Sequence, residues 1–185
     1  MKRIRMFVVC VTTVASACGT TGGDHERDVA GGHATQAQHN HSPYASHQTR
    51  EIKALSTDEV EGYLSGAGLG MALPAELNGY PGPRHVLELA DGLGLSQEQA
   101  AEVRRIFDSM ESQAIEIGVQ VVEAERQLDT EFAERTISPT RVTRLTDKIA
   151  RLQGQLRAVH LLAHLGVAAA LTPEQRKTYD RLRGY

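Results

Sequence analysis

Two long series of apolar residues, spaced alternately three and four positions apart, constrain the fold of this chain most. The first series is Phe107, Met110, Ala114, Ile117, Val121, Ala124 and Leu128, and the second is Val142, Leu145, Ile149, Leu152, Leu156, Val159 and Ala163. This spacing places the apolar side chains of each series on one face of an α-helix. Because the two series have similar length and are joined by a short turn near residues 135–138, they predict an antiparallel helical hairpin.

Short polar motifs mark where the helices begin. Ser96 and Gln99 form a capping box, in which each side chain binds a backbone amide at the start of the first long helix. Ser138, followed by a proline, caps the second long helix, and Thr172 caps a last helix. Gly118 lies inside the first series and is expected to weaken that helix slightly. Strand-like alternation of apolar and polar residues is absent, so the predicted fold class is all-α, a long antiparallel helical hairpin with short flanking helices.

The first residues have the pattern of a secretory signal peptide over residues 1–17. Basic residues at positions 2, 3 and 5 precede an apolar run that ends in small residues at Ala17, and Cys18 follows directly. This arrangement resembles the cleavage box of bacterial lipoproteins, which implies lipidation of Cys18 and an anchor in the outer membrane. The alternative is ordinary cleavage near Ala17 without a lipid. Both interpretations predict an exported chain, and neither leaves a second cysteine for an internal disulfide.

Residues 18–48 predict a disordered tether, because they are rich in Gly, Thr, Ala, Gln and His and contain almost no large apolar side chain. Five of the eight histidines lie in this segment, and we call them the tether histidines: His25, His33, His39, His41 and His47. Either they collect metal ions loosely, since imidazole binds Zn, Cu and Ni, or they are incidental residues of a polar linker.

The rest of the chain divides into two parts. Residues 49–83 are expected to contain a short helix within 51–64, followed by a glycine- and proline-rich strap (residues 66–83) that lies across the helices. Residues 84–185 form the predicted helical-hairpin domain, which starts with a short helix over residues 84–91.

Charge and motif content exclude two classes of function. Removing the three basic residues of the signal peptide takes the formal net charge from −3 to −6, because −3 minus 3 is −6. Such an acidic chain lacks the basic stripe that nucleic-acid-binding proteins carry. There is no nucleophile elbow, no phosphate-binding glycine loop after a strand and no HExxH motif, so the sequence does not predict an enzyme.

Two histidines on the second long helix form a candidate metal site. His160 and His164 are four residues apart, which places both imidazoles on one face of the helix. If the hairpin turns near residue 136, facing residues have numbers that sum to roughly 272. His164 is then expected near Asp108, and His160 near Glu111 or Ser112. Two imidazoles and a carboxylate suit Zn, Ni, Co or Cu(II).

Two further residues bear on this site. His85, on the short helix before the hairpin, is the candidate fourth ligand. Met110 belongs to the apolar series and is expected to fill the core rather than to bind a metal. The alternative for both histidines of the second helix is a structural role, with hydrogen bonds to nearby acids or to water.

The sequences LSQEQ at 95–99 and LTPEQ at 171–175 resemble the twin L-T-x-x-Q boxes of the Spy/CpxP family of small periplasmic helical proteins. The stretch 159–181 is also similar to the end of nickel and cobalt sensors of the CnrX type, in which a histidine and a sulfur ligand four residues later bind metal. His160 occupies the first of these positions, and His164 replaces the methionine. Those sensors carry two further histidines, four apart, before the first box, where this chain has only one.

The resemblance and the candidate site together predict an exported periplasmic metal-binding protein for heavy-metal sensing or resistance, with Zn, Cu, Ni or Co as the ion. The first alternative is an ATP-independent chaperone of the Spy/CpxP kind that holds unfolded client proteins. A third interpretation is a modulator of a membrane-bound sensor kinase. The family often dimerises through its hairpins, so the resemblance also implies a homodimer.

Overall fold

A computed structural model describes residues 42–185, which belong to one compact unit. The predicted signal peptide, Cys18 and the tether histidines other than His47 lie outside the described residues. Within residues 42–185 all regular structure is helical, and none of these helices is long and apolar enough to cross a membrane.

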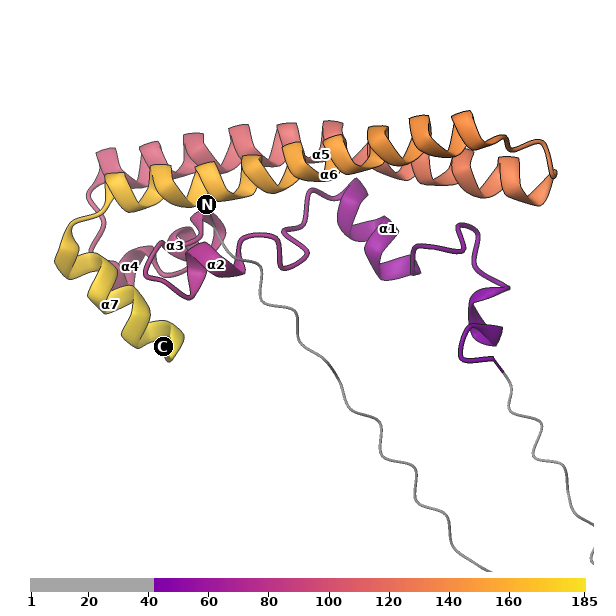
Figure 1. The fold of residues 1–185 in the computed structure, drawn as a ribbon. Helices are drawn as coiled ribbons and strands as arrows, with labels where there is room; N and C mark the ends of the chain where they lie inside the picture. The colour runs from indigo at the N-terminus through magenta and orange to yellow at the C-terminus, as the bar shows by residue number, and fades with distance from the viewer. Residues whose placement is uncertain (1–41) are drawn as a thin grey trace, which may run out of the picture. The chain divides into compact units, whose positions relative to one another are not determined.

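The predicted hairpin is confirmed. Helices α5 (Gln97–Ala133) and α6 (Pro139–Ala170) run antiparallel along their whole length and are joined by a turn over residues 134–138 (Figure 1). Every residue of the two apolar series is buried or half-buried, so both helices turn the predicted face inward. The fold class predicted from the sequence, an all-α hairpin with short flanking helices, is therefore the one observed.

Two capping boxes that contain glutamine meet at the open end of the hairpin. Ser96 caps α5, and Thr172 caps α7 (Pro173–Arg183), each with the reciprocal side-chain bonds of a capping box. The amide groups of Gln99 and Gln175 also bind each other, with N···O distances of 2.8 and 3.0 Å. Gln99 donates in addition to the carbonyl oxygen of Ala170 at the end of α6. The boxes therefore join the start of α5, the end of α6 and the start of α7, because the glutamine side chains bond to their own helices and to neighbouring ones.

Four short α-helices lie along one side of the hairpin (Figure 1): α1 (Thr57–Leu64), α2 (Leu73–Glu76), α3 (Pro83–Glu88) and α4 (Ala90–Leu93). The 3₁₀-helix η1 (Ala45–His47) precedes them in the chain and buries none of its residues. The helix expected within 51–64 starts only at residue 57, because Ser56 is its cap. The helix expected over 84–91 is interrupted at Leu89, which ends α3 and precedes α4.

Gly118 has a role that the sequence did not reveal. It lies on α5 where the end of α1 crosses, and a Cβ atom at this position would be 2.0 Å from the backbone oxygen of Tyr63. The glycine therefore allows the backbones of α1 and α5 to approach closely. Tyr63 itself is buried in the same apolar core as Val121 and Leu156 of the hairpin, so this contact fixes where the strap begins.

Candidate functional site

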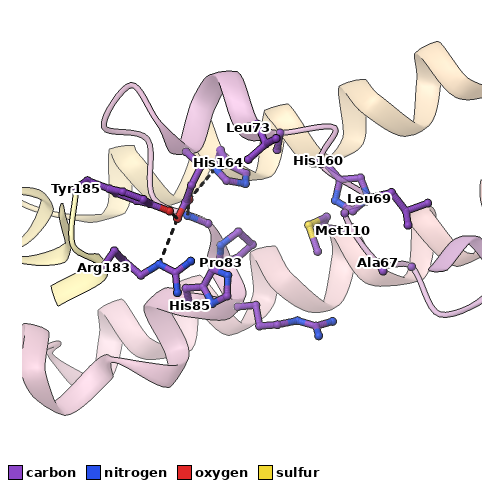
Figure 2. Close-up of a pocket in the computed structure, with 17 residues that line it drawn as sticks. Ala67, Leu69, Leu73, Pro83, His85, Met110, His160, His164, Arg183 and Tyr185 are labelled. Carbon is purple, nitrogen blue, oxygen red and sulfur yellow. Dashed lines mark hydrogen bonds and ion pairs between the residues drawn. The ribbon is translucent and has the colours of Figure 1, made fainter. Parts of the chain in front are cut away.

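A pocket with a volume of about 360 Å³ lies between the strap and the hairpin (Figure 2). The strap, the hairpin, α3 and the end of the chain all contribute to its wall. Its lining includes Glu76 and Gly82 of the strap, Met110 of α5, His160 and His164 of α6, and Arg84, His85, Arg183 and Tyr185. The pocket thus brings together both candidate histidines of α6 and the candidate histidine of α3.

His160 is almost completely buried, with 3% of its surface exposed. Its Nε2 atom has no hydrogen-bond partner within the described part of the protein. Burial lowers the pKa of the His160 imidazole, and the neighbouring His164 lowers it further. The ring is therefore neutral at neutral pH and carries one nitrogen lone pair. A buried polar atom without a partner is unfavourable, so this nitrogen is suited to a ligand that enters the pocket.

His164 is oriented by the strap. Its Nδ1 atom is 2.7 Å from the carbonyl oxygen of Tyr80. A carbonyl oxygen only accepts, so Nδ1 carries the proton, and the lone pair of the neutral ring lies on Nε2. The Nε2 atom lies close to Gly82, where an added Cβ would be 3.3 Å away. A backbone carbonyl that holds Nδ1–H while Nε2 stays available is the usual arrangement around a metal-bound histidine.

Glu76 is a buried carboxylate that no local sequence pattern singles out. Its Oε1 accepts from the hydroxyl groups of Tyr179 at 2.6 Å and Tyr185 at 3.0 Å, and its Oε2 accepts from the backbone amide of Gly82 at 3.0 Å. The Nε atom of Arg183 is 3.5 Å from Oε1. Burial raises the pKa of Tyr179, and the bond to the carboxylate raises it further, so the tyrosine stays a donor.

The predicted contact between His164 and Asp108 is not found. Asp108 is exposed and does not line the pocket, whereas the carboxylate nearest to His164 is Glu76, whose Oε2 is 3.8 Å from Nδ1. His85 lies at the edge of the pocket, and its Nδ1 is 2.8 Å from the carboxylate of Glu88. Met110, expected in the core, is buried and also lines the pocket.

No group of three His, Cys, Asp or Glu side chains is placed to hold a metal ion within residues 42–185. The three predicted histidines share a pocket but do not form such a group with a carboxylate. His47 lies apart from the pocket in η1. The pocket therefore offers His160 and His164 as nitrogen donors, and any third donor of its own must come from another kind of side chain.

A family model described as heavy-metal resistance matches residues 64–178 of the chain, which include the strap, both long helices and both boxes. Neither the curated proteins nor the solved structures include a significant match.

Proposed function

The chain belongs to the heavy-metal resistance family, and we propose that it binds a transition metal ion in the pocket between the strap and the hairpin. The observation that carries this proposal is the buried Nε2 atom of His160, which has no hydrogen-bond partner within residues 42–185. His160 and His164 would hold the ion through Nε2. The Nε2 atom of His160 has no partner among the described residues, and the carbonyl oxygen of Tyr80 keeps the proton of His164 on Nδ1. The bound ion would accept the lone pairs that the pocket otherwise leaves unused.

This role is one of binding and not of catalysis. A metal-binding protein of this kind contributes to resistance by retaining the ion or to sensing by responding to it. The residues around His164 favour sensing, because Tyr80 and Gly82 contact its ring and belong to the strap. Binding of an ion to this ring would therefore act directly on the strap.

Calorimetric titration of the full chain with Zn, Cu, Ni and Co tests the proposal. We expect one site with micromolar or better affinity that is lost in the variant His160→Ala/His164→Ala. A matched control replaces the tether histidines by alanine, which removes loose binding by that segment but leaves the pocket intact. Equal affinity in the parent and the double variant would exclude the pocket as the binding site.

We also propose that the chain works outside the cytoplasm, in the periplasm and anchored to the outer membrane through Cys18. The support is the basic start, the apolar run and the small residues before this cysteine. Cell fractionation combined with labelling by a fatty-acid analogue tests both parts. Label on the parent but not on a Cys18→Ser variant supports the anchor, whereas an unlabelled parent in the soluble envelope fraction excludes it.

One observation favours a chaperone as the second candidate function. The outer face of α6 carries the exposed apolar residues Leu162 and Leu165, with 63% and 51% of their surface accessible. The exposed basic residues Arg144, Lys148 and Arg151 continue the same face toward the turn, at spacings of three and four residues. Such a face suits an unfolded client with apolar and acidic segments.

An aggregation assay with a denatured client separates the two candidate functions. Protection that a chelator leaves unchanged and that Leu162→Ser/Leu165→Ser removes supports the chaperone. Protection that depends on metal, or no protection, supports the metal-binding role alone. A homodimer and a sensor partner remain proposals from the family resemblance, which sedimentation and pull-down from envelope extracts test.

A further inference from the structure

The geometry points to a soft monovalent ion, Cu(I) or Ag(I), as the occupant of the pocket, with the thioether of Met110 as the third donor beside His160 and His164. This inference rests on the proposed metal binding and specifies its ion class. It depends on three features of the pocket: the carboxylate is already occupied, the third donor is a thioether, and the surroundings lack the net negative charge that would favour a dication.

The carboxylate of Glu76 is not free to bind a metal ion. Both of its oxygens accept hydrogen bonds, from Tyr179, Tyr185 and the amide of Gly82, and Arg183 lies beside it. A metal bond to this group would compete with these donors, two of which are buried. The pocket therefore lacks the free oxygen anion that Zn, Ni and Co sites commonly use.

Met110 supplies the missing third donor. It lies on α5, it has 8% of its surface exposed, and its thioether side chain lines the same pocket as the two imidazoles of α6 (Figure 2). His85 is a weaker candidate because its Nδ1 already binds Glu88. A donor set of two neutral imidazoles and one thioether is soft and has a low coordination number. Thioether ligands select Cu(I) over the harder divalent ions.

The lack of a net negative charge around the pocket also favours a monovalent ion. Among the described residues, the charged side chains in its wall are Glu76, Arg84 and Arg183, and Glu111 lies 3.8 Å from Arg84, so these four charges sum to zero. None of the three proposed donors brings a negative charge. The cost of transferring an ion from water into such a site grows with the square of its charge, so a dication costs roughly four times as much as a monocation of equal radius.

Competition titrations in a reducing, oxygen-free buffer test the inference, with the full chain in which the tether histidines are replaced by alanine. Cu(I) is competed against a chromophoric Cu(I) chelator, and Zn(II), Ni(II) and Co(II) are titrated separately. We expect one Cu(I) per chain and the tightest binding for Cu(I). Met110→Leu should weaken Cu(I) binding by about tenfold or more and leave Zn(II) binding almost unchanged. Met71→Leu is the matched control, because Met71 does not line the pocket.

X-ray absorption at the copper edge gives a second readout that does not depend on affinity. The parent and Met71→Leu should show one sulfur and two nitrogen neighbours, and Met110→Leu should lose the sulfur. Circular dichroism shows whether Met110→Leu keeps its fold. Tight Zn(II), Ni(II) or Co(II) binding at the histidines without tighter Cu(I) binding, or a copper site without sulfur, overturns this inference and leaves the proposed function standing. Absence of binding by every ion overturns both.

Discussion

Replacing Gly118 by alanine should displace α1 from the hairpin. The added Cβ atom would lie 2.0 Å from the carbonyl oxygen of Tyr63, 2.8 Å from its carbonyl carbon and 3.2 Å from its Cα. All three atoms belong to the backbone, so no side-chain rotation relieves the contact. Either the end of α1 moves away from α5, or α5 bends.

Two opposite effects set the size of the change. Alanine is favoured over glycine inside a helix by about 1 kcal/mol. Overpacking in a well-packed core costs about 1–3 kcal/mol, and the upper end applies here because the nearest contact is far below 3.0 Å. The net expectation for Gly118→Ala is a loss of about 2 kcal/mol in the free energy of unfolding.

Gly154→Ala is the matched control. Gly154 lies exposed on α6, and a Cβ atom there would have no neighbour within 4 Å. This variant should gain about 1 kcal/mol, because only helix propensity changes. Urea denaturation followed by circular dichroism measures both variants. If Gly118→Ala gains stability as Gly154→Ala does, the close packing of α1 on α5 is wrong. Because the strap starts directly after α1, Gly118→Ala should also weaken the proposed binding of metal in the pocket.

Three further changes test other contacts. A double-mutant cycle of Gln99→Leu and Gln175→Leu should give a coupling free energy of about 1 kcal/mol, and a value near zero would mean that the two amides act independently. Tyr179→Phe removes a buried hydrogen bond to a carboxylate and should lower the free energy of unfolding by about 2 kcal/mol in urea denaturation. The hydrogen bond from Arg141 lowers the pKa of Glu131 below its ordinary value of 4.5. This interaction therefore stabilises the fold above pH 4.5, and the stabilisation is lost as the pH falls through the lower folded-state pKa. Between neutral and acidic pH, the free energy of unfolding of Arg141→Gln should fall less than that of the parent.

The long helices could be predicted because their signals are local. The apolar spacing fixes which face of each helix is buried, and Ser96, Ser138 and Thr172 bind backbone amides only three residues ahead. Neither signal requires knowledge of the rest of the fold. The close approach at Gly118 could not be predicted in this way, because it depends on which segment crosses α5 there.

The candidate site was predicted only in part for the same reason. The position of His160 and His164 on one helix face follows from their spacing, and the pocket contains both. The expectation that the numbers of facing residues sum to roughly 272 predicted how far along the hairpin Asp108 lies, but not on which side of α5. The Asp108 side chain is exposed to solvent. Glu76 comes from the strap, whose glycines and prolines carry no periodic signal. Its burial depends on Tyr179, more than 100 positions later in the chain.

The two glutamine boxes act on the pocket at a distance, through a continuous series of contacts. The pair of Gln99 and Gln175 fixes the start of α7 against the open end of the hairpin. This placement brings Tyr179, in the middle of α7, to the carboxylate of Glu76. Glu76 in turn binds the amide of the strap glycine that lies against the His164 ring. The boxes therefore position the His164 ring without contacting it, since each step in the series is a hydrogen bond or a close packing contact. A helix that only needed a cap would not require a glutamine that reaches a second helix, whereas a pocket built from several separate segments depends on contacts that hold those segments together.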